Sequence, residues 1–176
     1  MTADKIYLVG FMAAGKSTVG RVLAQRLGWQ AEDIDSLIEQ RERMTVADIF
    51  ARHGEPYFRR SEREMLRLLQ PMRHVVVATG GGTFVDAENR DFMNLDGVSI
   101  WLDVPLPELV ARIPLDGRRP LAADKAALEQ LYLARRESYR HAHVHIDSTH
   151  LAVDDVVGKI VDTLTARPPV LARPPA

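Results

Sequence analysis

The chain has 176 residues, 46% of them hydrophobic and 27% charged, which is typical of one globular domain and excludes a disordered chain. Its formal net charge of −1 shows no basic excess of the kind that nucleic-acid or membrane-surface binding requires. Disulfides and thiol chemistry are excluded because the chain has no cysteine, and no apolar run approaches the roughly 20 residues of a membrane span. With no signal peptide at the start of the sequence, we expect a cytoplasmic protein.

The first predicted unit is a strand, a glycine loop and a helix. The apolar run at residues 6–9 is typical of a short buried strand, and residues 19–27 carry apolar side chains at helical spacing. Between them, the sequence GFMAAGKST at residues 10–18 fits the phosphate-binding pattern G-x-x-x-x-G-K-[ST]. The alternative is a chance glycine turn, but the correct flanking elements favour a nucleotide site.

The chemistry of this loop follows from its place at a helix N-terminus. Successive backbone N–H groups there would form an anion-binding nest, with Lys16 reaching the β- and γ-phosphates. The Ser17 hydroxyl would bind Mg²⁺. Ala13 stands where many such loops carry another glycine, which the minimal pattern does not require. The predicted nucleotide-binding residues of the loop are Gly10, Ala13, Ala14, Gly15, Lys16, Ser17 and Thr18.

Two acidic residues follow near the end of a second predicted strand. That strand, within residues 29–35, is a poor one, because Ala31 and Glu32 do not suit a buried parallel strand. In an extended backbone Asp33 and Asp35 would share one face, so that one could serve Mg²⁺ and the other a substrate hydroxyl. The alternative is that these acids cap the helix that follows.

Three helices are predicted next, over residues 36–43, 46–52 and 55–69. Thr45 is expected to cap the second helix at its N-terminus and Gly54 to end it. The apolar face of the third helix consists of Phe58, Met65, Leu66 and Leu69.

A buried strand at residues 74–79 runs into three glycines, Gly80, Gly81 and Gly82. A flexible turn is one interpretation, but a turn seldom needs three glycines, whereas close approach of the backbone to a ligand does. The end of this strand lacks the acidic residue that many proteins with this phosphate-binding pattern place there, so Asp33 would have to serve as the outer magnesium group.

The remaining elements continue the alternation of strands and helices. We predict a strand at 98–102, a helix through Arg112, a polar loop at 114–124, a helix at 126–140, a strand at 144–147 and a helix at 153–164. This order indicates a parallel sheet with helices on both faces, which binds ligands at the carboxyl ends of its strands. The proline-rich tail at 167–176 is expected to be disordered.

Alternating histidines invite a metal hypothesis. His141, His143 and His145 would share a face only if all three lay in one strand, yet the preceding helix is predicted to reach His141. We therefore favour surface positions, or positions near the adenine edge, over a metal site.

Five motifs carry a family resemblance. GFMAAGKSTVG, D-x-D, EPYFRRSE, VATGGG and RRPL, in this order and at these intervals, resemble those of the shikimate kinase family over about residues 6–164. The resemblance implies transfer of the ATP γ-phosphate to the 3-hydroxyl of shikimate, with Mg²⁺, in aromatic amino-acid biosynthesis. It implies a three-layer P-loop kinase fold, with a five-stranded parallel sheet in the order 2-3-1-4-5.

The resemblance also implies a domain plan and a set of partners. A single P-loop kinase domain would cover residues 1–166, with a substrate-binding segment at about 34–62 and a lid at about 112–124. We expect a monomer that binds ATP and shikimate. An alternative is another small-metabolite kinase such as a gluconate kinase, which would lack Arg59 and the triple glycine. A non-kinase nucleotide switch is a further alternative, although the absence of an N-K-x-D motif argues against a GTPase.

Roles in the acceptor site follow from the same resemblance. Asp35 would contact the hydroxyls and act as the catalytic base, and Asp33 would lie near Mg²⁺. Arg59 would pair with the shikimate carboxylate, and Glu62 on the same helix could fix an arginine or meet the substrate. Arg135 would be a second contact for the carboxylate. The alternative for that second contact is the adjacent residue, Arg136.

The remaining implied roles concern the phosphates and the base of the nucleotide. The backbone at Gly80, Gly81 and Gly82 would approach shikimate and the γ-phosphate. Arg119 would close over the phosphates together with Lys16, with Arg118 as a competitor for that role. Arg112 would pack on adenine. The predicted catalytic residues are Lys16, Asp35 and Arg119.

Overall fold

The computed structural model describes residues 4–112 and 125–166. The predicted lid, including Arg118 and Arg119 but not Arg112, lies outside the described residues, and so does the proline-rich tail at 167–176. Within the described part, five parallel strands form one sheet in the order β2-β3-β1-β4-β5. This sheet confirms the predicted fold class.

The strands alternate with helices along the chain, as predicted. The strands are β1 (Lys5–Val9), β2 (Gln30–Asp33), β3 (Val75–Ala78), β4 (Val98–Asp103) and β5 (Val144–Asp147). The helices are α1 (Lys16–Leu27), α2 (Ile34–Glu42), α3 (Val46–His53), α4 (Glu55–Leu69), α5 (Ala87–Asp96), α6 (Leu106–Arg112), α7 (Lys125–Tyr139) and α8 (Val153–Ala166).

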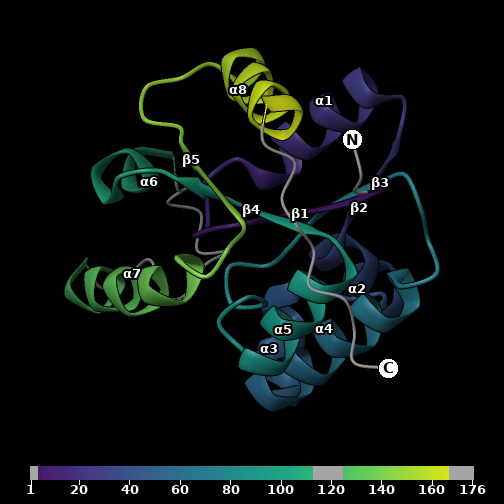
Figure 1. Cartoon of the computed structure of the whole chain (residues 1–176). Coiled ribbons are helices and arrows are strands. Elements are labelled where there is room, and N and C mark those ends of the chain that lie inside the picture. Colours follow the sequence, from purple (N-terminus) through teal and green to yellow (C-terminus); the bar gives the residue numbers. More distant parts are fainter. Residues whose placement is uncertain (1–3, 113–124, 167–176) are drawn as a thin grey trace.

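Helices cover both faces of the sheet. In Figure 1, α1 and α8 lie side by side over one face, and α5 packs on the other face near the group formed by α2, α3 and α4. Every residue of β1, β3 and β4 is consequently buried. Continuous apolar runs are typical of strands in a parallel sheet that is covered on both faces.

The second strand exists despite its unsuitable composition. β2 pairs only with β3, at one edge of the sheet, and its residues Gln30 and Ala31 are exposed. An edge strand buries less side-chain surface than a central one, so Ala31 and Glu32, which do not suit a buried strand, are tolerated there.

One helix, α5, was missed by the sequence analysis. Asp86 caps it by accepting a hydrogen bond from the backbone N–H of Asn89 at 3.0 Å, and Met93 is its fully buried apolar residue. The acid at the N-cap was the available signal for this helix.

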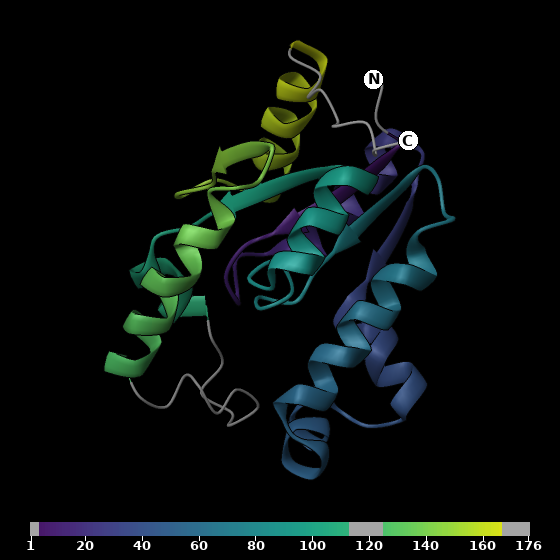
Figure 2. The ribbon, with the colours of Figure 1, turned by 60° about the horizontal axis from the view of Figure 1, so that its bottom comes forward.

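The loops that follow β1 and β3 lie between two groups of helices. Figure 2 shows α7, in green, on one side of these loops and α3 and α4, in blue, on the other. The carboxyl ends of the central strands therefore lie where helices from separate parts of the chain can contact them.

In the part of the chain that the structure describes, no helix combines the length and apolar character needed to cross a bilayer.

Candidate active site

The glycine loop after β1 leads directly into the N-terminus of α1. Gly15 forms the N-cap in the left-handed conformation, with φ of 89°, and no side chain caps the helix. The first N–H groups of α1 are thus left without a side-chain cap, which is the arrangement that binds phosphate. Ala13 also adopts a left-handed conformation, with φ of 62°, in the position where many such loops carry glycine.

The Lys16 side chain lies inside this loop. It is 8% exposed, and its Nζ donates hydrogen bonds to the carbonyl oxygens of Gly10 at 2.9 Å and Phe11 at 2.7 Å. The ammonium is thereby held beside the uncapped end of α1, where positive charge and open N–H groups together favour an anion.

Ser17 and Asp33 meet beside the start of α1. The Ser17 hydroxyl donates to Oδ2 of Asp33 at 2.5 Å, while Oδ1 of Asp33 accepts from the backbone N–H of Ser36 at 3.1 Å and so caps α2. A cavity of about 240 Å³ adjoins the pair. Mg²⁺ prefers oxygen ligands, and a hydroxyl and a carboxylate at this position fit such an ion.

Asp33 and Asp35 do not share a face of an extended backbone, so that expectation is wrong. The cap by Asp33 starts α2 at Ile34, which makes Asp35 a helical residue. Asp33 turns to Ser17, whereas Oδ1 of Asp35 lies 2.8 Å from the position that a Cβ on Gly80 would occupy. The two carboxylates therefore serve different parts of the site.

Side chains from three helices converge on the three glycines. A Cβ on Gly80 would lie 2.8 Å from Oε1 of Glu62 on α4, in addition to its contact with Asp35 on α2. A Cβ on Gly81 would lie 3.2 Å from Nη1 of Arg135 on α7. At these distances an added Cβ would force the facing polar group to move, so the absence of a side chain at each glycine lets that group lie against the loop.

Arg59 lies over the third glycine, where a Cβ on Gly82 would be 2.4 Å from its Nη1. Its Nη1 donates to the fully buried Glu62 at 2.7 Å, and its Nη2 donates to Glu55 at 2.8 Å. Burial disfavours the charged guanidinium, but the two carboxylates outweigh this and raise the pKa of Arg59. The arginine is thus charged and held at the glycine loop.

The two adjacent arginines of α7 point to different neighbours. Arg135 is 9% exposed, lies 5.7 Å from the ring centroid of Phe11, and forms no ion pair with any residue of the described ranges. Burial lowers its pKa. Arg136 instead donates to Oδ2 of Asp103 at 2.5 Å and lies over the ring of Trp101. Only Arg135 faces the glycine loop.

Arg112 lies at the end of α6. Its Nη2 donates to Oε2 of Glu108 at 3.1 Å, and Oε1 of the same carboxylate lies 3.1 Å from Nδ1 of His150. The Glu108 carboxylate thus joins α6 to the turn that follows β5.

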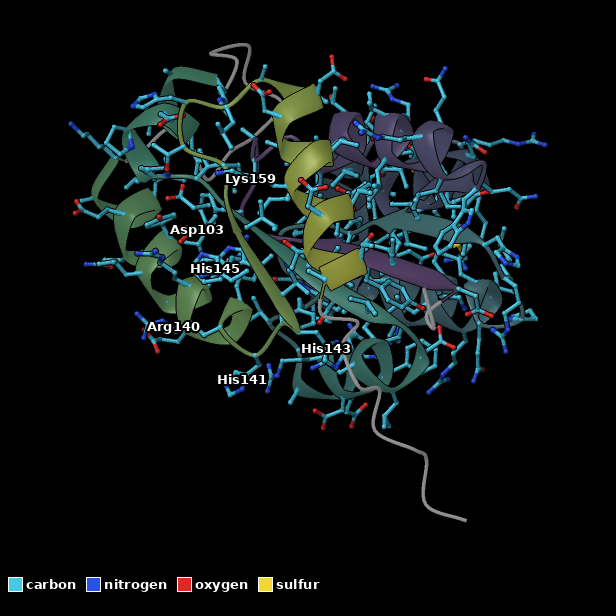
Figure 3. All side chains as sticks on the ribbon, turned by 45° about the horizontal axis from the view of Figure 1, so that its top comes forward. Asp103, Arg140, His141, His143, His145 and Lys159 are labelled. Carbon is cyan, nitrogen blue, oxygen red and sulfur yellow. The ribbon has the colours of Figure 1, made fainter. Side chains whose placement is uncertain are left out.

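The three alternating histidines have separate partners. Figure 3 shows His145 beside Asp103, with His143 and His141 farther toward the start of β5. Nε2 of His145 lies 3.0 Å from Asp103, Nδ1 of His143 accepts from the backbone N–H of Ser99 at 3.2 Å, and His141 is exposed. In residues 4–112 and 125–166, no group of three or more histidines and acids is placed to hold a metal ion.

Sequence reasoning missed two residues of the site. Thr83 donates to Oε1 of Glu62 at 2.5 Å, and Tyr139 donates to the carbonyl of Gly81 at 2.5 Å. Tyr139 follows Arg135 by four residues, a spacing that places both on one helix face and could have identified it. Nothing local distinguishes Thr83.

Comparisons with known proteins agree with this geometry. A family model described as shikimate kinase matches residues 12–165. The chain is 39% identical over 163 residues to the shikimate kinase of Sulfurihydrogenibium sp., covering 92% of this chain and 98% of that protein. It is 41% identical over 165 residues to the shikimate kinase of Geobacter metallireducens, covering 92% of each.

Solved structures give the same result. The shikimate kinase from Acinetobacter baumannii in complex with shikimate is similar at a TM-score of 0.89 and 37% identity, over 94% of each chain. A thymidylate kinase from Candida albicans shares the fold at a TM-score of 0.57 and 12% identity, covering 93% of this chain and 92% of that chain. The extent of the family-model match and the identity to curated relatives show that the chain belongs to the shikimate kinase family.

Proposed function

We propose that this chain transfers the γ-phosphate of ATP to the 3-hydroxyl of shikimate and releases shikimate 3-phosphate and ADP. The observation that carries the proposal is the convergence of Asp35, Arg59 and Arg135 on three glycines. The two guanidiniums can donate hydrogen bonds to a carboxylate of the substrate, and the carboxylate of Asp35 can accept a hydrogen bond from one of its hydroxyls. Membership of the family and a relative solved with shikimate support this assignment.

The donor half of the site binds the phosphates of ATP. Lys16 and the uncapped N-terminus of α1 neutralise their negative charge, and Ser17 and Asp33 would hold Mg²⁺. When bound, Mg²⁺ supplies further neutralisation of charge at the β- and γ-phosphates. Arg119 is proposed to add positive charge in the transition state, on the strength of the sequence alone, because it lies outside the described residues. Arg112 is proposed to pack on adenine.

The acceptor half positions shikimate. Arg59 and Arg135 bind its carboxylate from α4 and α7, so the ring is held between these helices. Asp35 accepts a hydrogen bond from the 3-hydroxyl and orients it or takes its proton. As the bond from this oxygen to the γ-phosphorus forms, the bond from that phosphorus to the bridging oxygen of ADP breaks.

The domain plan is part of the proposal. Residues 1–166 would form one kinase domain, with the substrate-binding segment at about 34–62 beginning near Asp35 and including Arg59. The proposed lid at about 112–124 begins at Arg112. We propose a monomer, because a single chain provides both halves of the site, and sedimentation of the purified protein tests this. We also propose that the protein is located in the cytoplasm.

The activity is tested with purified protein, ATP and Mg²⁺ and one acceptor at a time: shikimate, gluconate or a nucleoside monophosphate. ADP release that depends on shikimate is expected. Release with gluconate or a nucleotide, and none with shikimate, would overturn the proposal.

Arg59→Ala tests the acceptor assignment. We expect the KM for shikimate to rise on the order of 10- to 100-fold, because hydrogen bonds between charged groups are lost. ADP affinity should stay near that of the unchanged protein. Arg60→Ala is the matched control, since Arg60 is the exposed neighbour on the same helix. Loss of ADP binding in Arg59→Ala would show that its assigned role is wrong.

A further inference from the structure

Tyr139, the last residue of α7, contacts the middle of the glycine loop. Its side chain is 1% exposed, and its ring packs against Trp101 with the ring centroids 5.9 Å apart. Its hydroxyl donates a hydrogen bond to the carbonyl of Gly81 at 2.5 Å. Tyr139 and Arg135, one helical turn apart, thus both reach the same glycine.

This hydrogen bond fixes the direction of one peptide group. The peptide between Gly81 and Gly82 is trans, so its N–H points away from its carbonyl. With the carbonyl directed to α7 by Tyr139, the N–H of Gly82 is directed to the opposite side. The phenol therefore sets the orientation of a backbone donor that it does not touch.

The N–H of Gly82 is available to a ligand. It donates no hydrogen bond within the described ranges, whereas Thr83 donates to the carbonyl of Gly80 at 3.2 Å and Val85 to that of Gly82 at 3.1 Å. Gly82 is buried. Buried backbone donors are almost always paired, so a buried donor with no acceptor among residues 4–112 and 125–166 is open to an acceptor atom of a ligand.

The phenol of Tyr139 stays protonated at ordinary pH and so remains a hydrogen-bond donor. Burial raises the pKa of its phenol above the usual value, against a smaller opposing effect of the nearby Arg135. The hydroxyl consequently keeps its proton, and Gly81 keeps its partner, throughout the range in which a kinase works.

We propose that Tyr139 is a positioning residue of the acceptor site. By holding the Gly81 carbonyl, it presents the N–H of Gly82 to an oxygen of the phosphoryl acceptor. The inference rests on the proposed function, because it assumes that the acceptor binds at the three glycines.

Tyr139→Phe tests this role, with Tyr132→Phe as the matched control. Tyr132 lies on the same helix, is 9% exposed, and donates to the carbonyl of Val104 at 3.2 Å. Each change removes one hydroxyl and leaves one carbonyl without its donor, and Tyr139→Phe also removes the contact of the hydroxyl with Arg135, so its loss of stability should be equal or larger. Only Tyr139→Phe should raise the KM for shikimate, by about tenfold, with the KM for ATP unchanged.

A second measurement does not depend on turnover. In labelled protein without ligands, Tyr139→Phe should shift the amide resonance of Gly82, and Tyr132→Phe should leave it in place. An unshifted Gly82 resonance, or an unchanged KM for shikimate in an active Tyr139→Phe enzyme, would overturn the inference. Absence of shikimate-dependent ADP release from the unchanged protein would instead contradict the proposed function, and the resonance would still test the role of Tyr139.

Discussion

A Cβ on Gly82 would lie 2.4 Å from Nη1 of Arg59, so the guanidinium occupies the space that any other residue at position 82 would need. The atoms that would be displaced belong to the end of a flexible side chain and not to the backbone. A substitution at this glycine therefore acts on the position of Arg59 more than on the fold.

Gly82→Ala should raise the KM for shikimate by about tenfold or more, because Arg59 must move away from the loop. The free energy of unfolding should change by less than about 1 kcal/mol, since the guanidinium can shift. Gly158→Ala is the control, because its added carbon would meet no atom within 4 Å apart from the adjacent backbone of α8, and it should stabilise by about 0.5–1 kcal/mol. A normal KM in Gly82→Ala would show that the position of Arg59 does not matter.

Glu62→Gln should affect both stability and substrate use. The buried carboxylate accepts hydrogen bonds from Arg59 and Thr83, and its replacement by a neutral amide weakens both. The free energy of unfolding, measured with urea, should therefore fall by about 1–3 kcal/mol. The KM for shikimate should rise as Arg59 loses a partner. Glu64→Gln is the control on the same helix, where an exposed pair with Arg41 contributes less than about 1 kcal/mol. Equal effects of the two substitutions would contradict the proposed arrangement.

Arg135→Gln and Arg136→Gln should have different consequences. Arg135 is a buried cation with no ion pair in the described ranges, so its replacement should not lower the free energy of unfolding. The KM for shikimate should nevertheless rise by about 10- to 100-fold. Arg136→Gln removes the contact with Asp103 and should leave that KM nearly unchanged. The reverse pattern in steady-state kinetics would assign the carboxylate to Arg136.

Asp96→Asn should destabilise the fold without changing catalysis. Asp96 accepts from the fully buried Lys5 at 2.7 Å and from the hydroxyl of Tyr7 at 2.5 Å, at the amino ends of the strands and away from the glycine loops. Loss of the charge should cost about 3 kcal/mol in urea unfolding. Asp4→Asn, which breaks only the exposed pair with Arg73, should cost less than about 1 kcal/mol. A changed KM for shikimate in Asp96→Asn would contradict the prediction that Asp96 affects stability alone.

His143 should make stability depend on pH in the weakly acidic range. Burial lowers its pKa below the ordinary 6.5, so as pH falls the unfolded chain takes up this proton before the folded protein does. The stabilisation from neutral His143 is complete above about pH 6.5 and decreases as pH falls toward the folded-state pKa. In urea unfolding, the free energy of unfolding of His143→Gln should fall less steeply with decreasing pH than that of the unchanged protein. The exposed control, His141→Gln, should show the same pH dependence as the unchanged protein.

Local sequence patterns predicted those helices that have a clear apolar face or a clear N-cap residue. For α4 the sequence predicted both the bounds, residues 55–69, and an apolar face of Phe58, Met65, Leu66 and Leu69, and all four side chains are buried. The N-cap by Thr45 is likewise confirmed. The strand order came from the family resemblance, because periodicity alone does not say which strands pair.

Other features depend on contacts that are distant in the sequence. Lys5 and Asp96 are separated by 91 residues, and no local rule pairs them. The contacts of the glycines with helices α2, α4 and α7 likewise became visible only in the fold. The error at Asp35 was local, since the cap formed by Asp33 started the helix earlier than the pattern indicated.

The backbone at residues 80–82 contributes no side chain of its own to the acceptor site. Each glycine lies against a polar group from another helix, so replacing one of them would alter a contact instead of adding a new one. Redesign for a different acceptor would therefore begin with the facing residues of α2, α4 and α7 and leave the three glycines unchanged. A single substitution in the loop should reduce activity toward shikimate without creating a new specificity.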